Sequence, residues 1–394
     1  FFRAITFFTR TFFVLMNTLD DTNERAAQQL AAEAEMEDYR ESEDGKFHLD
    51  NGTAIFFDMK DIVYDKKRDA MGKGTFSEMV YRGKFKPFDM PIAIKSMNIL
   101  DRQSGDNERK GRDDRANEAQ MLRRGDAILV HPNVVKLYGF VTEEMTFYMC
   151  MELMDASLSE VKLVVYNSPD KLLEKPQIEF FLGCVVVSVV DALAFFRNDA
   201  RVLHRDLKPA NIMLNAQGEI KICDFGVSKK LQNATSKTRA TTGGIGTHIY
   251  MAPERFNGDL GVGRGYGSKS EVWSLGITLV ELATGVHPYG ALSSFSTPEV
   301  IGSEKEPSPS IADKEYSSKL RNFTNACLFK SEAQRASVLP LDASSADGKK
   351  DTNNLQSKQF YTANAARSDR NACVKAMLDH IADGLPAIRA KLTD

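Results

Sequence analysis

The chain has 394 residues, of which 42 % are hydrophobic and 27 % charged, so it is long enough for a globular protein of two lobes with extensions. Its formal net charge of −3 excludes a protein that binds nucleic acid or membranes through bulk charge, and no uninterrupted apolar run approaches the length of a membrane span. Five cysteines without paired spacing indicate reduced thiols in a reducing compartment, and we expect a cytoplasmic location.

The N-terminal stretch is unusual in composition. Residues 1–16 are rich in Phe and Thr and carry Arg3 and Arg10, so a targeting peptide is one interpretation. The favoured interpretation takes Met16 as the true first residue and residues 1–15 as not native. Residues 17–50 hold eleven acids against three bases, which predicts a flexible acidic arm. We therefore expect residues 1–54 to form an acidic extension.

Residues 55–151 have the pattern of short strands with one helix. Apolar positions at helical spacing, among them Ala119 and Leu122, predict the helix. The expected strands are Ile55–Val63, Pro91–Lys95 and Tyr148–Glu152, and the expected helix is Asp114–Arg124.

A glycine-rich turn lies ahead of the second of these strands. Gly72 and Gly74 flank Lys73, and two glycines let backbone amides approach phosphate oxygens without a Cβ in the way. By itself such a turn is more typical of a plain hairpin. Its distance from Lys95, which follows the apolar Ala93 and Ile94, favours a nucleotide site.

The second half of the chain is rich in helices. Glu179–Arg197 and Ser270–Thr284 are predicted as long helices, and a strand-rich half before a helix-rich half predicts an α+β protein of two lobes. The second lobe is expected over residues 152–335, followed by a polar insertion over 336–371 and a C-terminal helix over 372–394.

Two motifs near the middle of the chain carry the chemistry. The first is Leu-His-Arg-Asp-Leu-Lys-Pro-Ala-Asn at 203–211, and the second, Asp-Phe-Gly, begins thirteen positions after its Asn. They supply an acid that can take a proton (Asp206), a cation that can hold a phosphate (Lys208), and oxygen donors that suit Mg²⁺ (Asn211 and Asp224). A helix cap with a chance Asp is the alternative, but order, spacing and the intervening strand 220–223 all favour phosphoryl transfer.

These motifs match the signature set of the protein kinases, which the chain resembles over about residues 60–335. Stretches 151–158, 218–228 and 250–255 are similar to the dual-specificity mitogen-activated protein kinase kinases, a STE-type family. The resemblance implies a bilobal protein-kinase fold with a strand-rich N-lobe (55–151) and a helical C-lobe. It implies Asp206 as catalytic base, Lys208 beside the transferring phosphoryl group, and Asn211 and Asp224 as Mg²⁺ ligands.

The resemblance also implies an ATP site. Lys95 is expected to contact the α- and β-phosphates and to pair with Glu118, and Met151 is expected at the back of the pocket. Backbone groups of two further residues are expected to bind the adenine. The full expected set is Gly72, Lys73, Gly74, Lys95, Glu118, Met151, Glu152 and Met154, with ATP and Mg²⁺ as cofactors.

Residues 246–254 resemble the end of a kinase activation segment, and Glu254 is expected to pair with Arg335. Activating phosphates are expected at Thr242 with either Ser236 or Thr238. The expected partners are a downstream mitogen-activated protein kinase and an upstream activating kinase.

Three positions depart from the family pattern. Ser77 stands where a glycine is usual, Met79 where Val is usual, and Glu271 where Asp normally fixes the catalytic-loop backbone. For Glu271 we expect a loss of precision of about 1–3 kcal/mol. Two other interpretations remain, a serine/threonine kinase of a neighbouring family and a pseudokinase scaffold, the latter supported by Ser77 and Glu271 alone.

Overall fold

The structure is a computed structural model. It describes residues 45–49, 52–66, 69–73, 79–98, 123–124, 127–128, 130–143, 146–167, 173–200, 202–224, 229–230, 248–256, 267–293, 296–338 and 353–393. Several predicted features lie outside the described residues, namely most of the acidic arm, most of the 114–124 helix, Gly74, Ser77, Glu118, Ser236, Thr238 and Thr242.

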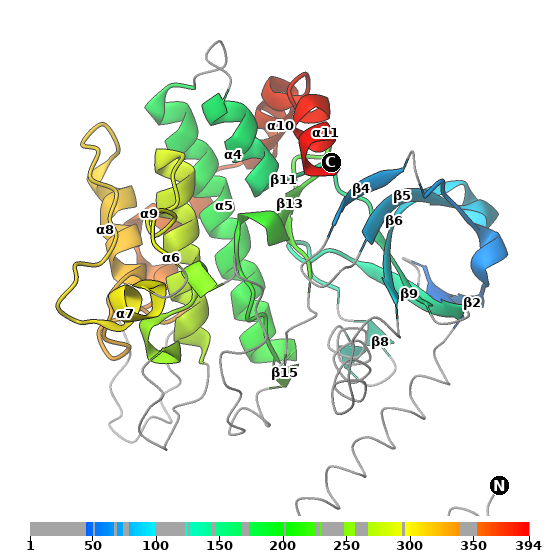
Figure 1. The fold of residues 1–394 in the computed structure, drawn as a ribbon, viewed down its shortest axis with the longest axis horizontal. Helices are drawn as coiled ribbons and strands as arrows, with labels where there is room; N and C mark the ends of the chain where they lie inside the picture. Colours follow the sequence, from blue (N-terminus) through cyan, green and yellow to red (C-terminus); the bar gives the residue numbers. More distant parts are fainter. Residues whose placement is uncertain are drawn as a thin grey trace, which may run out of the picture.

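The small lobe is built on one curled antiparallel sheet, drawn in blue and cyan in Figure 1. Among the described residues its eight strands have the order β2-β1-β9-β10-β6-β5-β3, and β4 also pairs with β5. The strands are β1 (Lys46–His48), β2 (Ala54–Phe56), β3 (Ile62–Val63), β4 (Ala70–Lys73), β5 (Met79–Phe85), β6 (Met90–Asn98), β9 (Leu137–Glu143) and β10 (Thr146–Glu152).

An aromatic cluster packs inside the curl of this sheet, and it includes a residue that precedes the expected start of the lobe. Phe47 of β1 is fully buried, with its ring stacked on Phe85 at 3.8 Å between centroids. The expected acidic extension over 1–54 is therefore corrected, since the globular domain already includes β1. The expected strand Ile55–Val63 is also divided, because Asp58 accepts a hydrogen bond from the Lys60 N–H and begins a 3-10 turn over Met59–Asp61.

The expected helix Asp114–Arg124 does not reach its predicted end. Arg123–Arg124 form β7, which pairs with β8 (Ala127–Ile128). The pairing of these two arginines with β8 in a short hairpin therefore overrides the helical spacing of the residues before them.

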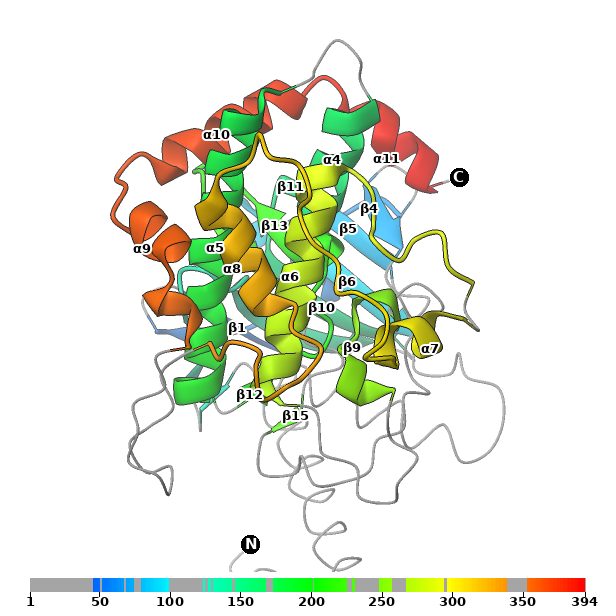
Figure 2. The ribbon, with the colours of Figure 1, turned by 90° about the vertical axis from the view of Figure 1, so that its left-hand side faces the viewer.

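The large lobe is helical, and the helices surround α5 (Figure 2). By length and composition α5 and the turn after it could cross a membrane, but two thirds of this apolar stretch is buried inside the protein, as the core helix of the lobe. The helices are α4 (Leu158–Asn167), α5 (Lys175–Phe195), α6 (Ser268–Thr284), α7 (Ser296–Gly302), α8 (Ser318–Cys327), α9 (Gln359–Ala365), α10 (Arg370–Ile381) and α11 (Leu385–Thr393).

Small strands lie where the two lobes meet. β11 (Ala156–Ser157), β13 (Ile212–Leu214) and β14 (Ile220–Ile222) form one sheet, and β12 (Val202–Leu203) pairs with β15 (Lys229–Lys230). The loop from β12 to β13 carries the first sequence motif, and the second begins just after β14. These short pairings hold both motifs at the junction of the lobes.

The C-terminal region differs from its prediction in two ways. The expected polar insertion over 336–371 contains α9, which buries Phe360 against Phe323 of α8. The expected single C-terminal helix is two helices, because the chain turns between α10 and α11 at Gly384, where a Cβ would lie 2.6 Å from a methyl group of Val164. In Figures 1 and 2 α11 lies beside β4, so the end of the chain reaches the small lobe.

The expected pair of Glu254 and Arg335 forms inside the large lobe. Arg335 is fully buried, and its two terminal nitrogens donate to the two carboxylate oxygens of Glu254 at 2.8 and 2.9 Å. Burial alone raises the pKa of Glu254, but the hydrogen bond and charge of Arg335 bring it below its ordinary value. The pair anchors the end of the activation segment to the loop after α8.

We predict that Arg335→Ala lowers the free energy of unfolding by about 3–5 kcal/mol, because it leaves a buried carboxylate without its counter-charge. Arg335→Lys keeps the charge but not the two-pronged geometry, so its loss is intermediate. Urea denaturation measures both. Lys84→Ala is the control, since the Lys84–Asp89 pair is exposed and contributes less than about 1 kcal/mol. Equal, small losses in Arg335→Ala and Lys84→Ala would contradict the assignment.

Candidate active site

The catalytic loop brings the first motif's polar side chains together. Lys208 Nζ lies 2.8 Å from Asp206 Oδ2, and the Asn211 side-chain amide donates to the Asp206 carbonyl at 2.8 Å and to its Oδ2 at 3.0 Å. Asp206 is 7 % exposed, so its carboxylate is held at the edge of a buried network. Because the Asn211 nitrogen makes both of these bonds, the amide oxygen remains available as a ligand.

The second motif approaches from the other side of the junction. Asp224 lies two residues after the end of β14, and its Oδ1 is 3.0 Å from Nζ of Lys95, which is 129 residues away in the chain on β6. Lys95 is 4 % exposed, and its strand is paired with β5 on one side and β10 on the other. An ammonium from the small lobe thus meets a carboxylate from the large lobe.

His204 links the two motifs from beneath. Its Nε2 lies 2.9 Å from the Cys223 carbonyl, which can only accept, so Nε2 carries the hydrogen. Its Nδ1 accepts the backbone N–H of Asp206 at 3.3 Å. Burial lowers the pKa of His204, in agreement with a neutral ring that donates at one nitrogen and accepts at the other. The loop residues ahead of Asp206 and Asp224 are thereby held in one position relative to each other.

The donor set fits a magnesium nucleotide. Carboxylate and amide oxygens are the ligands that Mg²⁺ prefers, and one or two of them with substrate phosphates complete its shell. Asp224 and Asn211 supply these oxygens, while Lys95 and Lys208 supply positive charge for phosphate.

The protein kinase domain matches residues 65–345. The chain belongs to the protein kinase family. MAP kinase kinase mkk-4 of Caenorhabditis elegans is 34 % identical over 275 residues, which is 68 % of each chain. Dual specificity mitogen-activated protein kinase kinase sek-1 of the same organism is 36 % identical over 222 residues, 56 % of this chain and 61 % of that protein. Protein kinase wis1 of Schizosaccharomyces pombe is 30 % identical over 294 residues, 73 % of this chain and 43 % of that protein.

Within the protein kinases the chain falls in the MAP kinase kinase branch, as the resemblance implied, and it is a phosphotransferase. The matches span less than two thirds of the length of the second and third relatives.

Glu271 of this kinase performs the task that its family gives to Asp. The side chain is fully buried in the first turn of α6, and Oε1 accepts the backbone N–H of Arg205 at 2.9 Å. The backbone of His204 donates to the same carboxylate. The additional methylene therefore does not prevent contact with the catalytic loop. The expected loss of precision in positioning the catalytic-loop backbone stays a prediction about activity.

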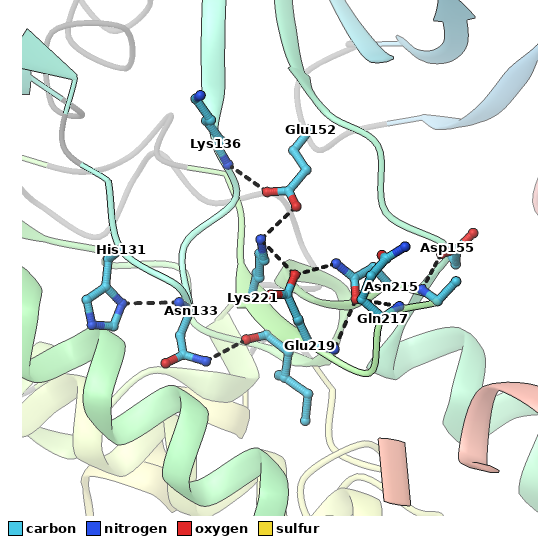
Figure 3. A network of polar contacts seen from close by, with 11 residues as sticks. His131, Asn133, Lys136, Glu152, Asp155, Asn215, Gln217, Glu219 and Lys221 are labelled. Atoms are coloured by element: carbon cyan, nitrogen blue, oxygen red, sulfur yellow. Dashed lines mark hydrogen bonds and ion pairs between the residues drawn. The ribbon is translucent and has the colours of Figure 1, made fainter. Parts of the chain in front are cut away.

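The link between the lobes includes a polar network that sequence reasoning missed (Figure 3). The Glu152 carboxylate, at the end of β10, accepts the N–H of Lys136 and pairs with Lys221 of β14 at 2.6 Å. Burial alone lowers the pKa of Lys221, but its contacts with Glu152 and Glu219 raise it above the ordinary value. A signal was present, because Glu219, just before β14, and Lys221 within it are two positions apart in extended chain and so share one face.

The network also bears on the expected adenine contacts. The N–H of Glu152 donates to the Lys136 carbonyl at 2.9 Å, so this N–H is already used within the protein. Met151 is half-buried and Met154 is 3 % exposed. The contacts of the Glu152 carbonyl and of the Met154 backbone with adenine stay predictions. Gly72 and Lys73 lie on β4, which pairs with β5, and their contacts with phosphate stay predictions.

We predict that Glu271→Gln removes a pH dependence of stability. Burial raises the pKa of Glu271 from 4.5 to about 7, against the opposing effect of the Arg205 and His204 N–H donors. The folded chain therefore keeps this proton over a pH interval in which the unfolded chain loses it. The stabilisation is complete below about pH 4.5 and is lost as the pH rises through 7, by on the order of 3 kcal/mol.

Urea denaturation between pH 5 and 8 measures this effect. The Gln side chain cannot titrate, so we expect the variant to gain stability relative to the wild type as the pH rises. Glu315→Gln, at an exposed position, is the control and should follow the wild type. Parallel profiles of Glu271→Gln and wild type would show that the carboxyl group does not titrate in this range.

Proposed function

We propose that this chain is a dual-specificity MAP kinase kinase that phosphorylates Thr and Tyr in the activation loop of a downstream mitogen-activated protein kinase. The observation that carries the proposal is the convergence of Asp206, Lys208 and Asn211 with the Lys95–Asp224 pair at the junction of the lobes. The similarity to relatives named as MAP kinase kinases supports the choice of substrate class.

Each residue has a definite part in the proposed reaction. Bound MgATP supplies the phosphoryl group and the charge of the metal. Asp206 orients the substrate hydroxyl and takes its proton, and the Asn211 amide keeps that carboxylate in position. Lys208 places positive charge beside the same carboxylate. This charge neutralises the phosphoryl group as it is transferred to the substrate hydroxyl. Lys95 holds the phosphates from the small lobe, and Asp224 and Asn211 bind the metal.

The proposal includes a cytoplasmic location. The five cysteines, at 150, 184, 223, 327 and 373, are all free thiols, which suits a reducing compartment.

We predict that Asp206→Asn lowers kcat about 10²–10⁴-fold, because the amide cannot accept the substrate proton. Binding of MgATP, followed as a thermal shift, should persist, since Asp206 acts on the hydroxyl. Lys84→Ala is the surface control and should retain full activity. Equal phosphate incorporation by Asp206→Asn and wild type would refute the assigned chemistry, and absence of a MgATP shift in wild type would favour the pseudokinase scaffold.

The substrate assay separates the two kinase readings. A panel of mitogen-activated protein kinases, each inactivated at its own catalytic Asp, is treated with the activated chain, and product sites are mapped by mass spectrometry. Phosphate on both Thr and Tyr of one activation loop supports dual specificity. Phosphate on Ser or Thr alone favours a serine/threonine kinase of a neighbouring family.

An upstream kinase is the second proposed partner. Activating phosphate on Thr242 with either Ser236 or Thr238 would place negative charge in the same activation segment that Glu254 anchors at its far end. We predict that Thr238→Ala combined with Thr242→Ala abolishes most of the activation by an upstream kinase, while Thr235→Ala does not. Undiminished activation of the double variant would reject this pair and leave Ser236 to be tested.

A further inference from the structure

We propose that Cys184 and Cys373 form a redox-active pair, which a peroxide oxidises to a disulfide that joins α5 to α10. Neither residue has a part in the proposed kinase reaction, so this modification site is independent of it.

The fold brings two cysteines from distant parts of the chain into contact. Cys184 lies in the middle of α5 and is 1 % exposed, and Cys373 lies in the first helical turns of α10, where it is half-buried. The Cys184 thiol donates to the carbonyl oxygen of Arg370 at 3.8 Å, and Arg370 lies one helical turn before Cys373 on α10. Because α5 packs against α10, this contact places the Cys184 sulfur at the turn of α10 that carries Cys373.

The surroundings of Cys373 favour its thiolate. Its N–H bonds the Asp369 carbonyl in the opening turn of α10, so the sulfur lies near the positive end of the helix dipole. The hydrogen bond from Cys184 and the charge of Arg367 lower the pKa of Cys373, while burial and the charge of Asp369 act in the opposite direction. Arg367 is fixed in place, since its guanidinium lies 3.5 Å from the ring centroid of Phe180 and pairs with Asp369 at 2.7 Å.

The two cysteines divide the work of a redox pair. Burial and the contact with Cys373 raise the pKa of Cys184, so it stays a thiol until Cys373 has reacted. Cys373 is reached from solvent, because its neighbours Asn371 and Ala372 are exposed. Cys150 and Cys327 are fully buried, and burial raises the pKa of both thiols, so neither matches Cys373 as a nucleophile.

The oxidation proceeds in two steps, with hydrogen peroxide as the simplest oxidant. The Cys373 thiolate attacks one peroxide oxygen, the O–O bond breaks, and the leaving hydroxide takes up a proton to become water. Cys373 is then a sulfenic acid. The Cys184 sulfur attacks the Cys373 sulfur, the S–O bond breaks, and a second water leaves with the Cys184 proton. Two thiols lose two electrons and two protons, and the peroxide is reduced to two waters.

The disulfide would fix the C-terminal helices to the core of the large lobe. The first turn of α10 supports the β13–β14 turn, because Gly218 packs so tightly on Asn371 that a Cβ would lie 2.1 Å from its carbonyl oxygen. Gly218 has a φ of +81°, which suits glycine at this close approach. Oxidation at Cys373 therefore acts next to the hairpin that carries Lys221.

The test uses the full chain, reduced and then treated with hydrogen peroxide. We expect the intact mass to fall by about 2 Da, a non-reducing peptide map to link Cys184 to Cys373, and dithiothreitol to reverse both. The melting temperature should rise by on the order of 5 °C in the oxidised form. A disulfide that links Cys223 instead, a Cys373 that passes to sulfinic acid while Cys184 stays reduced, or an unchanged mass would each overturn the proposal.

Variants identify the order of the steps. In Cys184→Ala the sulfenic acid at Cys373 cannot be resolved, so dimedone should label Cys373, whereas Cys373→Ala should show neither label nor cross-link. Cys327→Ala is the matched control, because it removes another buried thiol of the same lobe, and it should cross-link as the wild type does. Dimedone labelling that stays absent from Cys184→Ala would contradict Cys373 as the attacking thiol. The wild-type peptide map decides the matter even where a variant does not fold.

Discussion

The active site depends on a backbone held in an unfavourable conformation at two points. Arg205 and Asp224 have φ values of +71° and +68°, in the left-handed region that side chains other than glycine, Asn and Asp rarely adopt. This conformation costs on the order of 1–3 kcal/mol for a residue such as Arg205 and less for Asp, and it persists only where its surroundings determine it. The contacts around these two residues therefore decide whether Asp206 and Asp224 can face one site.

Those contacts come from buried polar groups on both sides of the loop. Glu271 accepts the N–H of Arg205 from below, and His204 donates to the carbonyl that precedes Asp224. Both groups are fully buried. A buried polar atom without a partner is costly, whereas a buried hydrogen bond holds its two partners rigidly in place. The longer side chain of Glu271 is accommodated because it extends from the first turn of α6 to the Arg205 N–H of the loop.

Sequence motifs predicted the chemistry better than they predicted the boundaries of the fold. Asp206, Lys208, Asn211 and Asp224 could be proposed as site residues because phosphoryl transfer demands those groups in that order, and Lys95 because an apolar strand placed it. Short elements were missed for a physical reason. A three-residue strand such as β1 has too few positions to show a period, and its place in the sheet depends on the packing of Phe47 against distant rings.

Long-range polar pairs were visible only in part. Glu254 and Arg335 could be paired because a family pattern names both ends, whereas Glu152 and Lys221 had no such guide and are 69 residues apart. The C-terminal helices illustrate the same limit. The sequence of α9 is typical of a polar insertion because few of its residues are apolar. The packing of Phe360 on Phe323 of α8 shows that the helix completes the core.

The hairpin of β13 and β14 joins the active site to these late elements of the chain. At its turn Gly218 rests on the backbone of α10, and on β14 Lys221 holds the carboxylate at the end of β10. Beyond α10, Arg389 of α11 bonds Glu160 of α4 while α11 contacts β4 of the small lobe. A displacement of the C-terminal helices would thus reach the link between the lobes by two routes, through the hairpin and through β4. Because Asp224 lies two residues after the end of β14, the position of this carboxylate is coupled to the packing of residues more than 140 positions further along the chain.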